Sequence, residues 1–204
     1  TIRKAIQNLS DEGYVKKVQG KGTFITYKKE KMYLNKPRGF KETLSSKGHS
    51  SKSDIIQASF LNADGDISEK LSIPLNTKVV YLERLVWEDN EPMAIDKIYI
   101  EDEKFPGFIT KLSKDRSFYT ILEKDYNIQP KHAVLEIDGI IAQNQHADLL
   151  KCNIGDPLFS INKISYDFED KPIHYSSTIV RCDRATYVVH TDNSNMMNTK
   201  TKSK

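Results

Sequence analysis

Arg84 is the residue most suited to binding a charged group. It continues an apolar, strand-like run and is flanked by Leu82, Leu85 and Val86. A guanidinium without a partner is costly in such surroundings. Arg84 therefore requires an anion, which is either a bound ligand or a carboxylate of the protein itself, since arginine often forms structural pairs.

A second candidate for binding an anion is the start of a predicted helix at Ser117-Phe118-Tyr119. Backbone N–H groups in the first turn of a helix have no intrahelical acceptor, and the positive end of the helix dipole lies there as well. Two interpretations of Ser117 stay open. Its hydroxyl either donates to an anionic ligand or caps the helix by accepting from the backbone.

Patterns typical of catalysis are missing from the sequence. It contains no Gly-x-Ser-x-Gly motif, no metal-ligand spacing and no Cys/His nucleophile pair. Cys152 and Cys182 lack Cys-x-x-Cys spacing or a companion His cluster, so they indicate neither a zinc site nor a disulfide scaffold. We therefore predict no catalytic residue, no metal and no cofactor, and we expect both thiols to be buried as small apolar side chains.

The composition is that of a globular protein with a core. Of the 204 residues, 38% are apolar and 29% are charged, and the length suits one domain together with a fragment of another. No run approaches the roughly 20 apolar residues of a membrane span, and no secretory leader is recognisable. A cytoplasmic location is therefore predicted.

Charge is divided unevenly along the chain. Residues 1–53 hold 13 Lys or Arg against 4 Asp or Glu, a net of +9, whereas residues 54–204 hold 18 against 24, a net of −6. An excess of positive charge attracts polyanions such as nucleic acid, although a lysine-rich face is often only a solvated surface. The pattern of the basic end has to decide between the two.

The basic end predicts a helix followed by a hairpin. In residues 1–9 the apolar side chains recur at i, i+3, i+4 and i+7, which is typical of an amphipathic helix with a basic outer face. Residues 14–18 and 23–26 are β-prone runs on either side of Gln19-Gly20-Lys21-Gly22, a glycine-rich turn. A helix of this kind fits the major groove of DNA, while a hairpin reaches along the backbone or into the minor groove.

The larger part of the chain contains one unit twice. Two β-prone runs joined by a polar turn that ends in proline span residues 79–100, and a second such pair spans residues 158–180. The two copies match at an offset of 79, which becomes 80 at the turn prolines, and this offset pairs Arg84 with Lys163. We infer a duplicated helix, short turn and long hairpin.

Hydrophobic periodicity predicts the remaining elements. Strands are predicted at Asp54–Leu61, Val79–Trp87, Met93–Ile100, Ala133–Ala142, Leu158–Phe168, Ile173–Val180 and Ala185–Thr191, and helices at Ile67–Leu71, Phe118–Tyr126 and Asn144–Lys151. Because hairpins dominate, we predict an α+β domain with a mainly antiparallel sheet and helices on one of its faces.

The basic end resembles the GntR family of repressors. The similar residues are Thr1-Ile2-Arg3-Lys4-Ala5, Leu9, Glu12-Gly13 and, most specifically, Gln19-Gly20-Lys21-Gly22-Thr23-Phe24. The resemblance implies a partial winged helix-turn-helix, the back half of a domain that begins with further helices upstream. It implies DNA contacts by Thr1, Arg3 and Lys4 of a recognition helix and by Gln19, Gly20, Lys21, Gly22 and Thr23 of the wing. Arg3 is the expected base reader, since arginine to guanine is the commonest specific contact.

Residues from about Gly39 to Thr191, beginning with Gly39-Phe40-Lys41-Glu42 and Gly48, resemble the effector domain of the HutC-type branch, known as the UTRA domain. This resemblance implies the chorismate-lyase-like fold and a small-molecule pocket in place of catalysis. It implies effector contacts by Arg84, Asp96, Ser117, Tyr119, His174 and Ser176.

Two departures from the family pattern bear on the effector. His174 stands where the family has a carboxylate, and Val86 stands where members that bind sugar phosphates often carry a second arginine. A ligand with one acidic group, or a sugar recognised in another way, therefore fits as well as a sugar phosphate. The segment Arg181-Cys182-Asp183-Arg184 resembles the closing motif of the family, and we expect it to form a structural ion pair with Asp183.

The sequence thus predicts a bacterial transcriptional regulator, expected to be a repressor. The predicted parts are the partial winged helix-turn-helix 1–26, a linker 27–38, the effector domain 39–191 and a polar tail 192–204 that is expected to be disordered. A homodimer would bind a palindromic operator DNA, and a small anionic metabolite such as a sugar phosphate would control that binding. The alternative is a small-molecule-binding enzyme of chorismate-lyase-like fold.

Overall fold

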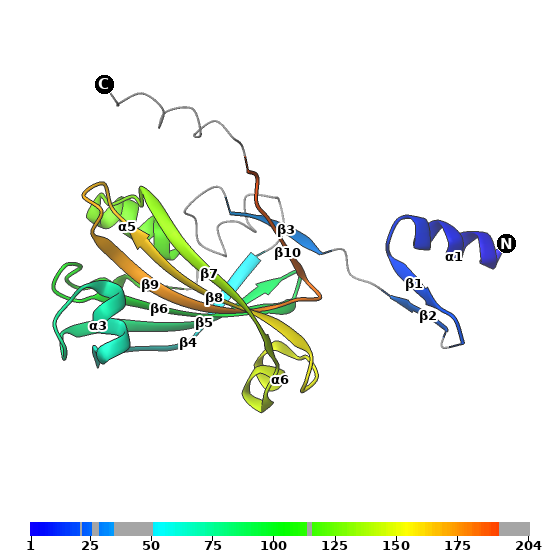
Figure 1. The fold of residues 1–204 in the computed structure, drawn as a ribbon, viewed down its shortest axis with the longest axis horizontal. Helices are drawn as coiled ribbons and strands as arrows, with labels where there is room; N and C mark the ends of the chain where they lie inside the picture. The colour runs from blue at the N-terminus through cyan, green and yellow to red at the C-terminus, as the bar shows by residue number, and fades with distance from the viewer. Residues whose placement is uncertain (21, 26–28, 35–50, 114–115, 192–204) are drawn as a thin grey trace, which may run out of the picture.

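The computed structural model describes residues 1–20, 22–25, 29–34, 51–113 and 116–191. Lys21, the start of the predicted effector domain (39–50) and the predicted tail 192–204 lie outside the described residues. Within the described residues the predicted α+β class is confirmed, because a large antiparallel sheet carries a few short helices (Figure 1).

The helices and strands agree well with those predicted for the larger part of the chain. The N-terminal elements are α1 Ile2–Asp11, β1 Val15–Val18, β2 Gly22–Ile25 and β3 Glu30–Tyr33. The later elements are β4 Ser51–Asn62, α3 Gly65–Leu71, β5 Lys78–Glu88, β6 Glu91–Glu101, α4 Phe108–Lys111, α5 Phe118–Tyr126, β7 His132–Ile141, α6 Asn144–Leu150, β8 Pro157–Tyr166, β9 Pro172–Arg181 and β10 Ala185–Val188. Strand β3 and helix α4 were not predicted.

Six strands form one antiparallel sheet in the order β4-β5-β6-β9-β8-β7. Two copies of a strand–helix–hairpin unit, β4-α3-β5-β6 and β7-α6-β8-β9, meet where β6 pairs with β9. In the first hairpin Arg84 lies opposite Asp96, and in the second Lys163 lies opposite Ser176. The predicted duplication is therefore confirmed, and it places the two cations at equivalent positions.

Helices cover both faces of this sheet. On one face, called here the α5 face, α4 and α5 pack on Val80 and Leu82 of β5. On the other face, α3 packs against Val79 and α6 against Leu85. The prediction of helices on one face is wrong, because the central strands carry buried apolar residues in nearly continuous runs, and such runs require cover on both sides.

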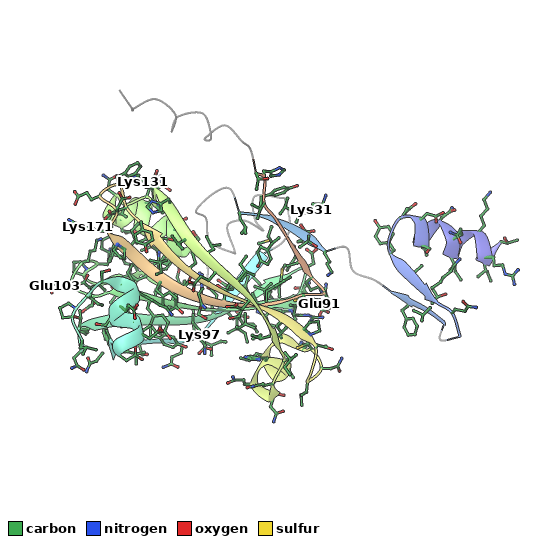
Figure 2. The ribbon with its side chains drawn as sticks, viewed as in Figure 1. Lys31, Glu91, Lys97, Glu103, Lys131 and Lys171 are labelled. Carbon is green, nitrogen blue, oxygen red and sulfur yellow. The ribbon has the colours of Figure 1, made fainter. Side chains whose placement is uncertain are left out.

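Strand β3 forms a separate two-stranded sheet with β10 and packs against the large sheet. It lies within the predicted linker and pairs in parallel with β10, and its Met32 is 3% exposed. Met32 packs on the α5 face in a cluster with Val86, Ala94 and Ile161, called here the Met32 cluster. Lys31 of β3 and Glu91 of the β5–β6 hairpin are labelled at the same end of the sheet in Figure 2. This strand was not predicted because only Met32 of its four residues is buried, so the lysine-rich segment shows no apolar alternation.

Residues 1–20 and 22–25 form a small separate unit of α1 and the β1–β2 hairpin, which Figure 1 shows apart from the large sheet. The helix has no buried residue, and Ile2 is 81% exposed. Gly20 and Gly22 at the hairpin turn have φ angles of 76° and 116°. Glycine adopts these angles without a steric penalty, which explains the glycine-rich turn.

Candidate functional site

A band of polar side chains, all buried except the partly buried Lys163 and Tyr119, crosses the middle of the α5 face. Its members come from four adjacent strands and from α5, and are Arg84, Asp96, Thr178, Ser176, Lys163, Ser165, His174 and Tyr119. Apolar residues lie on both sides of this polar band, since the cluster beneath α5 includes Leu82 and the Met32 cluster includes Val86. Polar groups in such a position require partners, because few water molecules can reach them.

Arg84 and Asp96 form a buried ion pair across β5 and β6. Nη2 of Arg84 lies 2.5 Å from Oδ2 of Asp96, and their side chains are 5% and 6% exposed. The hydroxyl of Thr178 donates to Oδ1 of Asp96 at 2.9 Å. Of the two interpretations of Arg84, the structure thus shows the internal carboxylate, but Nε of Arg84 is buried without a partner among the described residues. This N–H group can still donate to a ligand.

A second cluster lies where α5 covers the band. Nζ of Lys163 donates to the hydroxyl oxygen of Tyr119 at 3.0 Å. The same oxygen lies 3.3 Å from Nε2 of His174 and 3.4 Å from Oγ of Ser165. The ring of His174 also meets the edge of Phe118, with the ring centres 4.8 Å apart. Packing of α5 on the sheet therefore decides which groups surround His174.

The imidazole of His174 is held in its neutral form. Burial is the main cause that lowers its pKa well below the usual value, and the positive charges of Lys163 and Arg84 lower it further. A neutral imidazole has one N–H donor and one acceptor nitrogen. The remaining ring nitrogen, Nδ1, is buried and has no partner among the described residues. The polar band thus offers two buried nitrogen atoms, Nε of Arg84 and Nδ1 of His174, for contact with a ligand.

Most of the predicted effector-binding residues lie in or beside this band. Ser176 is 3% exposed and lies opposite Lys163 in the strand register. Ser117 is the N-cap of α5, and its Oγ accepts from the backbone N–H of Thr120 at 3.0 Å. The contacts of Ser117 therefore match the capping interpretation. As the N-cap, Ser117 stands two residues before Tyr119, which lies in the first turn of α5.

Three residues of the band were not predicted as site residues, namely Lys163, Ser165 and Thr178. The internal repeat carried a signal for Lys163, because the offset of 79 residues matches it to Arg84. Ser165 and Thr178 had no such signal. Their role depends on which strands pair and in which register, and the pairing is a property of the assembled sheet.

The predicted DNA-contacting residues lie on the small N-terminal unit. Thr1, Arg3 and Lys4 are exposed at the start of α1. Gln19, Gly20, Gly22 and Thr23 are exposed around the β1–β2 turn, and Lys21 lies outside the described residues. A helix and a hairpin tip with exposed polar side chains are compatible with contacts to DNA.

The closing motif of the large domain is structural. Nη2 and Nε of Arg181 donate to the carboxylate of Asp183 at 2.7 and 3.0 Å, as predicted, and Nη1 donates to the carbonyl of Leu150 at 3.1 Å. Cys152 and Cys182 are free and only partly buried, so the expectation that both are buried is wrong. Among the described residues, no group of three or more His, Cys, Asp or Glu side chains could hold a metal ion.

Comparison with known proteins establishes the family to which the chain belongs. The family model of the UTRA domain matches residues 46–186, which contain the whole polar band. The chain belongs to the GntR family of transcriptional regulators, in the branch that carries a UTRA domain. The predicted family is thereby confirmed, and this GntR-family chain is a transcriptional regulator.

Related proteins support the same family. The protein from Shigella flexneri named as a probable fructoselysine utilization operon transcriptional repressor is 35% identical over 189 residues, which are 93% of this chain and 77% of that protein. The HTH-type transcriptional regulator YurK of Bacillus subtilis, itself uncharacterized, is 33% identical over 190 residues, which are 93% of this chain and 78% of that protein.

Solved structures show the same fold. The crystal structure of PhnF from Mycobacterium smegmatis superimposes with a TM-score of 0.79 at 23% identity, covering 94% of this chain and 84% of PhnF. The C-terminal domain of Yurk from Bacillus subtilis superimposes with a TM-score of 0.67 at 25% identity, covering 80% of this chain and all of that domain. Among the described residues of the GntR-family chain, every helix is too short or too polar to cross a bilayer.

Proposed function

We propose that this chain is an effector-responsive repressor that acts as a homodimer, in which a small anionic metabolite bound at the polar band controls binding to operator DNA. The observation that carries the proposal is a pair of buried nitrogen atoms, Nε of Arg84 and Nδ1 of His174, for which the described part of the chain supplies no hydrogen-bond partner. Leaving a buried polar group unsatisfied costs about 1–3 kcal/mol, so a ligand that contacts both gains from relieving that cost.

The charges of the polar band favour a ligand with negative charge. Arg84 and Lys163 each bring a positive charge to the band, and His174 beside them is neutral. Asp96 already accepts hydrogen bonds through both of its oxygens. A sugar phosphate or a sugar-derived acid would place its anionic group near the two cations, and the operon named for the Shigella flexneri relative makes fructoselysine and its derivatives suitable members of a ligand screen.

The Met32 cluster lies next to the band on the same strands and would provide the route to the DNA-binding unit. On β5 the next residue on the same face after Arg84 is Val86, and on β8 the residue that precedes Lys163 on that face is Ile161. Val86 and Ile161 both pack with Met32 of β3, the strand that follows the wing. A ligand that shifts the strands of the band would therefore move the strand that leads to the DNA-binding unit.

The edge strand β7 supports the proposed homodimer. Among the described strands it pairs with β8 alone, so its outer backbone groups can extend the sheet into a second copy. Val134 on one side of the strand and Ile137 and Ile141 on the other are 53%, 39% and 67% exposed. Apolar residues on both sides of an edge fit pairing of two strands better than burial of one face.

A thermal-shift screen tests the effector proposal. A metabolite that binds the folded protein raises its melting temperature by mass action, so phosphorylated sugars, sugar acids, amino acids and fructoselysine are compared at equal concentrations. Lys163→Met should weaken the binding of the active compound at least about tenfold, which corresponds to the loss of one hydrogen bond to a charged group. Lys97→Met is the matched control, because Lys97 follows Asp96 on β6 and points to the opposite face.

Two measurements complete the test. The active compound should change the affinity of the protein, with its complete DNA-binding domain, for operator DNA in a mobility-shift assay. Light scattering should give the mass of a dimer, and Ile141→Asp should lower it to that of a monomer. The proposal fails if no anionic compound raises the melting temperature, or if both lysine variants bind the compound as the wild type does.

A further inference from the structure

His174 combines two features that together determine what it can bind. Its Nε2 faces the hydroxyl of Tyr119, while its Nδ1 is buried without a partner among the described residues. The ring is 1% exposed, so bulk solvent does not reach that nitrogen. Whether Nδ1 carries a hydrogen atom decides whether the group it binds must be an acceptor or a donor.

The partners of Tyr119 determine where the imidazole proton lies. The ammonium group of Lys163 can only donate, so the hydroxyl oxygen of Tyr119 accepts this bond. The hydroxyl proton of Tyr119 is then available for His174 at 3.3 Å or for Ser165 at 3.4 Å. An imidazole nitrogen is a much stronger base than a serine hydroxyl, and a hydroxyl polarised by an ammonium ion donates best to the stronger base. Tyr119 therefore donates to Nε2 of His174, and the ring proton lies on Nδ1.

We infer that the relay from Lys163 through Tyr119 holds His174 as an Nδ1–H donor, so that the effector atom bound there is a hydrogen-bond acceptor, and most favourably an anionic phosphate or carboxylate oxygen. The inference rests on the proposed effector site, and it assigns a specificity role to His174. Nε of Arg84 is the second buried donor of the band. Two N–H donors close to the charges of Arg84 and Lys163 match an oxyanion, favour it over a neutral hydroxyl, and reject an ammonium group, which has no lone pair to accept with.

The tautomer of His174 can be measured without an effector. Long-range nitrogen–proton correlation spectra of the protein labelled with nitrogen-15 distinguish a ring protonated at Nδ1 from one protonated at Nε2, and the His174→Asn variant assigns the signals. We expect the Nδ1–H form in the wild type. In Tyr119→Phe, which lacks the donor to Nε2, we expect the Nε2–H form to become populated.

Inorganic phosphate serves as the probe for binding. His174→Asn places an amide N–H near the position of Nδ1, whereas His174→Gln places it near Nε2, so the asparagine variant should bind phosphate within about threefold of the wild type. His174→Gln should bind about tenfold more weakly and His174→Glu still more weakly, because losing a hydrogen bond to a charged group costs at least about a factor of ten. His132→Asn is the control, since His132 lies on β7 and is exposed.

The outcomes separate this inference from the proposed function. A ring protonated at Nε2 in the wild type overturns the inference, whether or not an effector is found. Equal phosphate affinity of the wild type and His174→Glu overturns it as well. A ring protonated at Nδ1 in a protein that no anionic metabolite stabilises supports the tautomer assignment and overturns the proposed function instead.

Discussion

Burial of neutral His174 makes the stability of the protein depend on pH. In the folded protein its pKa is lowered, chiefly by burial and then by Lys163 and Arg84. In the unfolded chain the imidazole titrates near pH 6.5. Below that pH the unfolded chain binds a proton that the folded protein does not, so the free energy of unfolding falls as the pH falls.

The size of this effect follows from the proton count. One extra proton bound by the unfolded chain gives a slope of about 1.4 kcal/mol per pH unit, and the loss between pH 7 and pH 5 is about 2 kcal/mol while His174 stays neutral in the folded state. His174→Asn and His174→Gln remove the titrating group. Both variants should therefore lose about 2 kcal/mol less stability than the wild type between these two pH values, whatever their absolute stability.

Urea unfolding followed by the fluorescence of Trp87, the single tryptophan, measures these free energies at each pH. Tyr119→Phe is the control, because it leaves His174 buried beneath α5 and should keep the slope of the wild type. Carboxylates also titrate in the lower part of this range, but they contribute equally to the wild type and to the variants. Parallel pH profiles for the wild type and His174→Asn would refute the claim that a neutral, buried imidazole is present.

Three further substitutions test the packing around the polar band, each by urea unfolding. Arg84→Ala should cost about 3–5 kcal/mol of unfolding free energy, since it leaves the carboxylate of Asp96 buried without its cation. The double variant Arg84→Leu with Asp96→Leu should cost less than Arg84→Leu alone or Asp96→Leu alone. A double variant whose loss equals the sum of the two single losses would contradict this. Met32→Ala should cost about 2–4 kcal/mol, because Met32 packs in a core cluster, whereas a loss below about 1 kcal/mol would show that β3 is not held there. Ser117→Ala should cost about 1 kcal/mol through loss of the α5 cap, and Ser117→Asp should restore most of it.

Most strands and helices could be predicted from short sequence patterns, because these patterns depend only on residues that are close together in the chain. Alternation of apolar residues and the proline-ended turns predicted the hairpins of β5 with β6 and of β8 with β9, since side-chain direction in a strand has a period of two. The same argument failed for β3, whose four residues include one buried side chain. The argument also did not predict that helices cover both faces of the sheet. A strand buried on both sides appears as a continuous apolar run, and such a run does not show which elements pack on each side.

The candidate site was predictable only in part. Arg84 could be recognised as a site residue because a charged side chain inside an apolar strand requires a partner of opposite charge. Its partner could not, since either a ligand or an internal carboxylate satisfies the same requirement. The structure shows Asp96 as the partner, because the register of β5 and β6 places the two residues directly opposite one another.

By itself the sequence determined the class of protein and the duplicated architecture, because a wing motif and an offset of 79 to 80 residues are both readable along a single chain. Only the tertiary structure decided which polar groups meet. Tyr119 comes from α5, Lys163 from β8 and His174 from β9, and these elements contact one another because α5 folds back over the sheet. Contacts of this kind depend on how elements pack, and packing between distant segments leaves no periodic signal in the sequence.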